Sequence, residues 1–211
     1  MLEDISLFFC LDDEALQNFE QLATRKRFPK NTIVFSKGDE SDSLYIIQSG
    51  RVKAVIHDTE GKEIVLSLIG SGEYFGEMAA LDGVPRSATI VTKEPTEMLI
   101  VHRNDFKSIL ASNPDMAFNL LKVLLERLRR ANEKIESLAF TNVHGRVANL
   151  LMQFAERRGQ QWVIEEKLTH QEIANMIGSS REMVSRILGE LAESGHISID
   201  QKRITINKKL G

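Results

Sequence analysis

The chain has 211 residues, of which 42% are hydrophobic and 27% are charged, and its formal net charge is −3. A chain of this size and balance is typical of a globular protein with two modest domains. It has no apolar run near the roughly 20 residues that span a bilayer, and its acidic first residues do not resemble a secretory signal. We therefore expect a soluble, cytoplasmic protein with no membrane partner.

Cysteine and histidine usage argues against a metal or a covalent cofactor. Cys10 is the only cysteine, which excludes an intramolecular disulfide and an iron–sulfur cluster held by four thiolates of one chain. The histidines lack the spacing of a zinc site.

The formal charge is divided unevenly along the chain. It is −5 over residues 1–140 and +2 over residues 141–211, which together give −3. A more basic C-terminal part is compatible with binding to nucleic acid.

The first half of the chain has the pattern of an antiparallel β domain. A short acidic helix is expected at residues 12–23. From residue 31 to residue 103, runs rich in β-branched residues alternate with turns that contain glycine, as in rolls and barrels. The expected strands cover residues 32–35, 44–47, 52–56, 64–69, 88–91 and 97–101.

A long helix is expected to begin at Asn113 and Pro114. Its seam positions recur at alternating intervals of three and four residues, and they are Phe118, Leu121, Leu125, Leu128, Asn132, Ile135 and Ala139. This is a heptad pattern, and one asparagine in such a seam fixes the register of a dimer. The pattern therefore favours a homodimer. The alternative is a single amphipathic helix packed on the β domain, because such helices share this period.

The residues from about 141 onward predict a winged helix-turn-helix. The expected elements are a helix at 147–157, a strand at 162–164, two short helices, and a hairpin with strands at 197–199 and 204–206. The fold class is then α+β. Its parts are an N-terminal β-roll domain at residues 1–112, a dimerisation helix at 113–138 and a winged helix-turn-helix domain at 139–211.

Residues 75–89 contain groups that a cyclic phosphodiester needs. Binding such an anion takes an arginine fork, backbone N–H donors and an acceptor for the ribose 2′-hydroxyl. Gly76 lets the backbone approach a ligand, and Glu77 can accept from the hydroxyl. Met78 and Ala79 can begin a short helix whose N–H groups face the anion.

An arginine and a serine complete this cassette. Arg86 follows a proline, and Ser87 comes next. Taken alone, a Gly-Glu pair or an arginine after a proline is more often part of a solvated turn than of a site. The conjunction of these residues at this spacing favours a cyclic-nucleotide site at Gly76, Glu77, Arg86 and Ser87.

Two helix-start signals lie ten residues apart in the C-terminal part. Thr169 with Glu172, and Ser179 with Glu182, each match a capping box. A turn is expected at Gly178, between the two helices. The apolar positions expected to face the core are Ile173, Ala174, Ile177, Val184, Ile187, Leu188 and Leu191.

The opposite face of the second helix presents Arg181, Glu182, Ser185 and Arg186, where a recognition helix meets base edges. Arginine can contact guanine bidentately, and glutamate can accept from cytosine. This face can therefore specify a short half-site with G·C pairs, although a charged, solvated helix face has the same composition. Further contacts, with DNA phosphates, are expected from Thr169, His170, Ser180 and Lys202.

With these motifs in view, the chain resembles the cyclic-AMP receptor protein and fumarate-nitrate regulator (Crp/Fnr) superfamily of bacterial transcription factors over nearly its full length. Residues 75–89 are similar to its phosphate-binding cassette, and residues 181–186 match its Arg-Glu-x-x-x-Arg reader. The resemblance implies a cyclic nucleotide, first of all cyclic AMP, as effector. It also implies a palindrome with TGTGA-like half-sites, RNA polymerase as a partner, and Arg127 in the ligand site.

The chain departs from the cyclic-AMP receptor branch in the dimer helix and in one loop. Ala131 and Asn132 stand where that branch has a threonine and a serine that contact adenine. Asn132 either hydrogen-bonds a purine or pairs with its own symmetry mate. The connection at residues 157–161 is shorter than the polymerase-contacting loop of the superfamily.

Two rival hypotheses stay open. One keeps the DNA-binding regulator but gives it another effector or none, and the other makes the chain a nucleotide-sensing subunit that binds a protein partner. The sequence has no nucleophile–base motif, metal constellation or Walker lysine, so we expect no enzyme activity.

Overall fold

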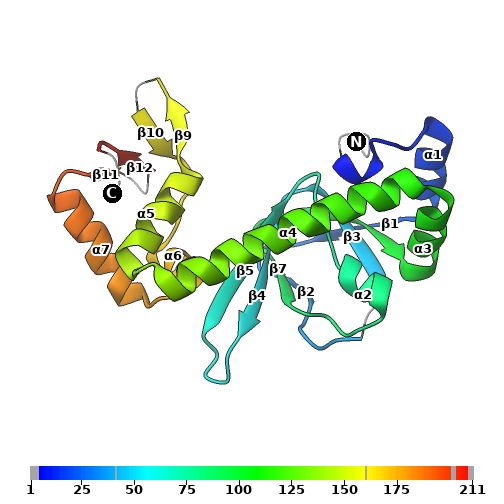
Figure 1. Ribbon diagram of the computed structural model, residues 1–211, viewed down its shortest axis with the longest axis horizontal. Coiled ribbons are helices and arrows are strands. Elements are labelled where there is room, and N and C mark those ends of the chain that lie inside the picture. Colours follow the sequence, from blue (N-terminus) through cyan, green and yellow to red (C-terminus); the bar gives the residue numbers. More distant parts are fainter. Residues whose placement is uncertain (1–4, 41, 160, 201–202, 209–211) are drawn as a thin grey trace. The chain divides into compact units, whose positions relative to one another are not determined.

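The computed structural model describes residues 5–40, 42–159, 161–200 and 203–208 (Figure 1). Contacts between Cα atoms divide the chain into two compact units, Met1–Leu128 and Arg129–Gly211. The division falls inside one long helix, α4 (Pro114–Phe140). None of the described helices is both long enough and apolar enough to cross a membrane.

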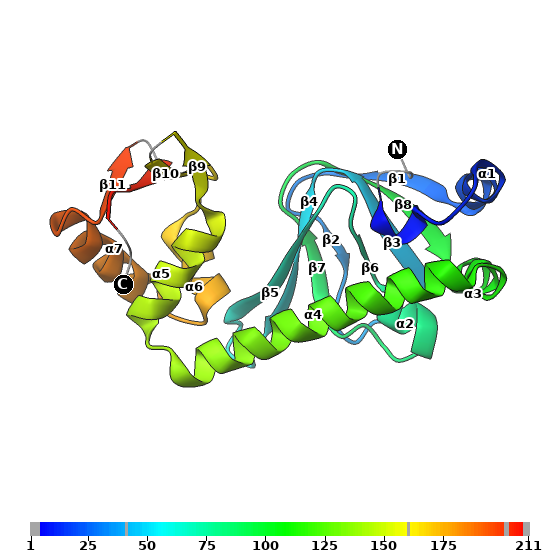
Figure 2. The same cartoon turned by 45° about the horizontal axis from the view of Figure 1, so that its top comes forward.

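The first unit is built on β-strands that all pair antiparallel. They are β1 (Thr24–Phe28), β2 (Ile33–Phe35), β3 (Ser43–Ser49), β4 (Arg51–His57), β5 (Glu63–Gly70), β6 (Tyr74–Phe75), β7 (Thr89–Thr92) and β8 (Thr96–His102). They form two four-stranded sheets, ordered β1-β8-β3-β6 and β2-β7-β4-β5 (Figure 2). The expected N-terminal β domain is confirmed.

The first unit also contains short helices. They are η2 (Ser6–Phe8), α1 (Asp13–Leu22), α2 (Glu77–Asp82) and α3 (Arg103–Ser112). Helix α1 was predicted, whereas β1 and α3 were not. Strand β1 carries four exposed residues and buries only Phe28, so it has no apolar run, and it lies at the end of its sheet. Helix α3 fully buries a single residue, Phe106, which is too weak a periodic signal.

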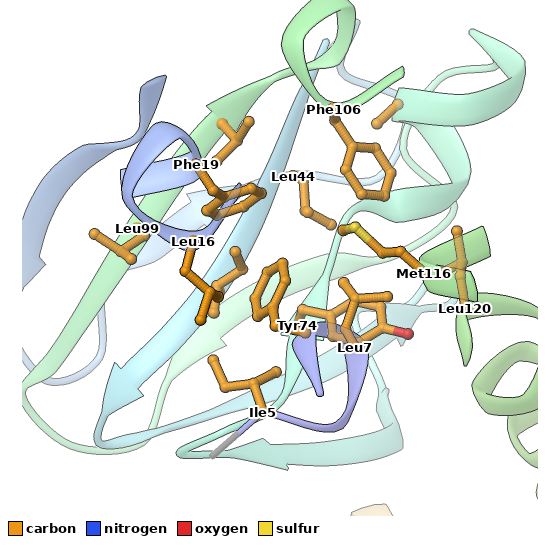
Figure 3. Close-up of a cluster of buried hydrophobic side chains, with 14 residues drawn as sticks. Ile5, Leu7, Leu16, Phe19, Leu44, Tyr74, Leu99, Phe106, Met116 and Leu120 are labelled. Carbon is orange, nitrogen blue, oxygen red and sulfur yellow. The ribbon is translucent and has the colours of Figure 1, made fainter. Parts of the chain in front are cut away.

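The main core of this unit lies between the sheet of β3 and the helices that cover it (Figure 3). Leu44 and Ile46 of β3 alternate inward and are fully buried, as the period of a half-buried strand requires. Phe19 of α1 and Phe106 of α3 meet the same cluster, and so does Met116 of α4. A second cluster around Ile47, Val52, Phe75, Ile90 and Met98 fills the space toward the other sheet.

Helix α4 has two apolar stripes. Met116 and Leu120 are buried in the core of the first unit, as the single-helix alternative requires. The heptad positions lie elsewhere on the helix surface, and the exposed fractions are 63% at Phe118, 54% at Leu121, 51% at Leu125, 57% at Leu128 and 64% at Ile135. Packing on the β domain therefore accounts for the first stripe and leaves the heptad stripe uncovered in the single chain.

The second unit follows the order of a winged helix-turn-helix. Its elements are α5 (Val143–Phe154), β9 (Glu156–Arg158), β10 (Gln161–Ile164), α6 (His170–Ile177), α7 (Arg181–Glu193), β11 (Ile197–Asp200) and β12 (Arg203–Ile206). The strands form one sheet of order β11-β12-β10-β9. The predicted two helices and C-terminal hairpin are present.

The predicted helix at residues 147–157 is wrong at both ends. Helix α5 begins at Val143, because the Asn142 side chain caps it by accepting from the Gly145 N–H at 2.8 Å. It ends at Phe154, and the three polar residues of β9 then pair with β10. Pairing at the edge of a sheet overrides the helix propensity of Glu and Arg.

Candidate ligand cassette and DNA-reading helices

The turn at Gly76 shapes the predicted cassette. Gly76 has φ +85° and is the N-cap of α2, and this left-handed backbone is one that residues with a side chain rarely adopt. A Cβ atom at this position would also lie 2.5 Å from Arg86 Nη1 and 3.0 Å from the Ser43 carbonyl oxygen. Glycine is therefore required both by the turn and by the close approach of Arg86.

Glu77 is the first residue of α2, and it is buried with 4% of its surface exposed. Arg127 of α4 compensates this carboxylate, because its Nη1 donates to Glu77 Oε1 at 2.9 Å. Arg127 Nη2 also donates to the Tyr74 carbonyl oxygen, and the guanidinium carbon lies 5.0 Å from the centre of the Tyr74 ring. These contacts bring two predicted ligand residues, Glu77 and Arg127, together.

Arg86 contacts the same Gly76 turn and is almost fully buried, with 3% exposed. Its Nη1 donates to the Gly76 carbonyl at 2.9 Å, and its Nη2 donates to the Ser43 carbonyl at 2.8 Å. Burial lowers the pKa of Arg86 from its usual value, and electrostatic interactions with Tyr45, Glu77 and Asp42 oppose that shift. The result is a fixed, desolvated cation beside the start of α2.

The other predicted ligand residues differ in position. Met78 and Ser87 are exposed, and the Ser87 hydroxyl lies 3.8 Å from the Met78 sulfur. Ala79 is buried, so it can offer only its backbone. Asn132 is exposed, belongs to the second unit and makes no side-chain hydrogen bond among the described residues.

Two backbone groups that hold the arginines were not among the predicted site residues. These are the carbonyl oxygens of Ser43 and Tyr74. Every residue carries a carbonyl, so no residue type signals this role in a sequence.

The helix-turn-helix begins with α6, whose predicted capping box is confirmed. The Thr169 hydroxyl accepts from the Glu172 N–H at 3.2 Å, and the Glu172 carboxylate accepts from the Thr169 N–H at 2.9 Å. Gly178 ends α6 with φ +64°, and a Cβ there would lie 3.1 Å from Leu138 Cδ2 of α4. The last turns of α4 therefore pack against the turn of the helix-turn-helix.

The predicted start of α7 is wrong by one residue. Ser180, not Ser179, is the N-cap, and its hydroxyl accepts from the Met183 N–H at 3.2 Å. Glu182 is therefore the second helical residue, one position too early to complete a capping box. Two serines stand side by side, and only the backbone decides which one is the cap.

The apolar positions predicted to face the core of α6 and α7 are buried, with one exception. The buried residues are Ile173, Ala174 and Ile177 of α6 and Val184, Ile187 and Leu188 of α7, while Leu191 is only half-buried. Leu191 lies near the helix end, where fewer neighbours cover it.

The predicted reading face of α7 is exposed and lines one shallow hollow, formed by Arg181, Glu182, Ser185 and Arg186. Arg186 packs along its own helix, with Nη2 2.9 Å from the Met183 sulfur and Nε 3.7 Å from Glu190 Oε1. Contacts of this kind at an exposed helix surface are weak, so Arg186 can exchange them for a ligand.

The predicted phosphate contacts are less uniform. The hydroxyls of Thr169 and Ser180 both take part in helix caps at the N-termini of α6 and α7. His170, the first residue of α6, is half-buried. Lys202 lies outside the described residues.

Comparison with known proteins agrees with this arrangement in both units. Residues 25–113 match the model of the cyclic nucleotide-binding domain, and residues 145–209 match that of the Crp-like helix-turn-helix domain. Over 184 residues the chain is 37% identical to the CRP-like cAMP-activated global transcriptional regulator of Mycobacterium tuberculosis, with 85% of this chain and 82% of that protein covered. Over 196 residues it is 35% identical to the cyclic AMP receptor protein of Thermus thermophilus, with 93% and 88% covered.

A solved structure shows the same architecture. The c-di-GMP responsive global regulator CLP of Xanthomonas campestris superposes with a TM-score of 0.83 at 26% identity, covering 93% of this chain and 100% of that chain. Both domain models, the curated relatives and the fold agree. The chain belongs to the Crp/Fnr family, and it is a DNA-binding transcription regulator with a cyclic-nucleotide-binding domain.

Proposed function

We propose that the protein is a homodimer whose affinity for a palindromic DNA site is set by a cyclic nucleotide bound in the β domain. The observation that carries this proposal is the geometry around Gly76. Arg86 donates to the Gly76 carbonyl, and Arg127 of α4 pairs with the next residue, Glu77. A cyclic phosphodiester has one negative charge and one free ribose hydroxyl. Arg86 would meet the charge, and Glu77 would accept from the hydroxyl.

The remaining ligand contacts would come from around this turn. Met78, Ala79 and Ser87 would contribute backbone and hydroxyl donors at the start of α2. Arg127 would hold Glu77 in place, and Asn132 would contact the base or fix the dimer register. Cyclic AMP is the first candidate, since the names of the M. tuberculosis and T. thermophilus relatives state that ligand.

The dimer proposal rests on the heptad stripe of α4. Its large apolar side chains are more than half exposed in the single chain, and stripes of that kind are buried by a second helix in a coiled coil. The corresponding parts of the chain would be a β-roll domain at residues 1–112, a dimer helix at 113–138 and a DNA-binding domain at 139–211.

The DNA-reading proposal rests on the exposed face of α7. Arg181 and Arg186 would contact guanines, and Glu182 would accept from a cytosine in TGTGA-like half-sites. Ser185 would add a hydrogen bond, while Thr169, His170, Ser180 and Lys202 would contact phosphates. A dimer must place its two reading helices about 34 Å apart on B-DNA, so a ligand that changes this spacing changes affinity.

Three further points complete the proposal. The protein would act in the cytoplasm, RNA polymerase would be its partner at promoters, and it would carry out no catalysis.

A second candidate function keeps the DNA binding but changes the effector. Ala131 and Asn132 favour it, because they replace hydroxyl residues that contact adenine in the cyclic-AMP receptor branch.

Calorimetric titration with cyclic AMP, cyclic GMP and cyclic-di-GMP tests the ligand half of the proposal. We expect one of them to bind wild-type protein and to lose at least about tenfold in affinity in Arg86→Ala, which is about 1.4 kcal/mol. The same loss in Arg86→Lys is expected, because lysine lacks the planar fork.

A duplex-binding measurement on Arg181→Ala tests the DNA-reading half of the proposal. We expect this variant to lose duplex binding while its ligand binding stays unchanged. Duplex binding that survives in Arg181→Ala would contradict the role of Arg181 as a base contact, and absence of specific duplex binding by the wild type would favour the protein-partner hypothesis.

A further inference from the structure

Two aromatic rings lie against the Arg86 guanidinium. The guanidinium carbon is 4.0 Å from the centre of the Phe35 ring and 5.5 Å from the centre of the Tyr45 ring. Phe35 belongs to β2 and Tyr45 to β3, which are strands of different sheets. The cation is therefore contacted by rings from both sheets of the β domain.

A third ring keeps these two in place. Phe75 of β6 is opposite Tyr45 in the antiparallel register, and the two rings stack with centres 5.1 Å apart and planes 5° from parallel. The Phe35 ring is tilted against both, at 5.5 Å from Tyr45 and 5.8 Å from Phe75. Phe75 is 2% exposed, so the aromatic cluster of Phe35, Tyr45 and Phe75 has little freedom to turn away from Arg86.

The chemistry of these contacts suits an arginine that must bind an anion. Removing a guanidinium from water is unfavourable unless other groups stabilise the charge, and Arg86 is almost fully buried. Aromatic faces and backbone carbonyls stabilise a cation without themselves carrying an opposite formal charge, so they offset the desolvation of Arg86 without adding a negative group beside Gly76.

We propose that Phe35 and Tyr45 are positioning residues for Arg86, and this inference rests on the proposed nucleotide site. Their ring faces fix the plane of the guanidinium, while the carbonyls of Gly76 and Ser43 fix its rotation within that plane. The arginine is thereby oriented before the ligand arrives, and the affinity that this orientation supplies depends on the electrostatics of the rings as well as on their shape.

Fluorinated phenylalanines at position 35 distinguish the effect of the ring's charge distribution on nucleotide affinity from the effect of the ring's size. One, two or three ring fluorines weaken attraction to a cation stepwise and change ring volume little. For the nucleotide that binds wild-type protein most tightly among cyclic AMP, cyclic GMP and cyclic-di-GMP, we expect affinity to fall with each fluorine. The trifluorinated protein should lose about threefold to tenfold, which is about 0.7 to 1.4 kcal/mol. The midpoint of thermal unfolding should fall only slightly, because the same ring–cation contact also stabilises the buried Arg86, and the protein should stay folded at the temperature of the titration.

The same fluorination at Phe106 is the matched control. That ring is fully buried in the core cluster that does not include Phe75, so affinity should not change there. Conventional variants extend the test to the second ring: Tyr45→Leu, which removes the aromatic face, should lose more affinity than Tyr45→Phe, which keeps the face and loses only the hydroxyl interaction with Arg86. Equal affinities along the Phe35 series, or equal losses at Phe35 and Phe106, would overturn the proposal.

A measurement without nucleotide separates this inference from the proposed function. Slow rotation of a clamped guanidinium gives Arg86 resolved side-chain nitrogen signals in NMR spectra. These signals should merge in the trifluorinated Phe35 protein and stay resolved in the Phe106 control. Absence of nucleotide binding by wild-type protein would contradict the proposed function. Arg86 signals that stay resolved in the trifluorinated Phe35 protein would contradict the role of Phe35 in positioning Arg86.

Discussion

Arg127 of α4 donates to the carboxylate of Glu77 of α2 over 2.9 Å, and this bond ties the long helix to the start of the cassette. The Glu77 side chain is 5% exposed, while that of Arg127 is 33% exposed. In the proposed function the ribose hydroxyl meets Glu77, so a ligand acts directly on a group that holds α4. The pair therefore links the proposed ligand site to α4 directly.

Removing Arg127 should destabilise the protein. Arg127→Met leaves the buried Glu77 carboxylate without its cation, and we expect a loss of about 2 kcal/mol, less than the roughly 3–5 kcal/mol of a fully buried pair because Arg127 is partly solvated. Adding Glu77→Gln removes the uncompensated charge and should restore part of the loss. Urea unfolding of the wild type, Arg127→Met, Glu77→Gln and the double variant measures this. A double variant as unstable as Arg127→Met would argue against the pair.

The cap of the reading helix gives a sharper comparison. Ser180→Ala removes the side chain that accepts from Met183 N–H, and helix caps of this kind contribute about 1 kcal/mol. Ser179→Ala, one residue earlier, should change the free energy of unfolding by much less, because the Ser179 side chain caps nothing. If the two variants were equally unstable, Ser180 would not be the cap.

Much of the fold is predictable because its signals are local. Alternating burial in β3 and β4, the long heptad run of α4 and the apolar spacing of α6 and α7 all depend on neighbours within one element. The cassette was recognisable for the same reason, since Gly76, Glu77 and Arg86 lie close together in sequence.

Features that depend on contacts between distant residues were not predictable. Arg127 and Glu77 are 50 residues apart, and the rings of Phe35 and Tyr45 reach Arg86 only through the packing of two sheets. Strand β1 is held by pairing with β8, although its own residues are mostly exposed. The choice between Ser179 and Ser180 as the cap follows from backbone angles that neither serine encodes.

Gly178 offers a test of the turn between α6 and α7. Gly178→Ala places a side chain in the left-handed region and 3.1 Å from Leu138, and we expect a loss of about 1–2 kcal/mol. Gly189→Ala is the matched control, because Gly189 lies inside α7 with nothing within 4 Å of an added Cβ. That change should stabilise by about 0.5–1 kcal/mol. Thermal unfolding of both variants would reveal opposite signs, and equal signs would contradict this geometry.

The heptad stripe predicts how the protein assembles. Leu125→Glu places a charge at a seam position that is 51% exposed in the single chain, and a charge inside a coiled-coil seam is strongly unfavourable. Sedimentation velocity should then find monomers at concentrations where the wild type is a dimer. Leu66→Glu, at a residue of β5 that is 43% exposed, is the control and should leave the dimer intact. A dimeric Leu125→Glu protein would place the interface elsewhere.

The most direct test of the central claim is the affinity of the full-length protein for a duplex with a TGTGA-type palindrome, measured by fluorescence anisotropy at fixed salt. The titration is made without nucleotide and with cyclic AMP, cyclic GMP or cyclic-di-GMP, using wild type and Arg86→Ala. We predict that one nucleotide tightens binding by at least about tenfold, or about 1.4 kcal/mol of coupling, and that Arg86→Ala abolishes this gain. Tight binding that is indifferent to all three would contradict nucleotide gating, and the absence of specific binding under every condition would contradict the proposed DNA site.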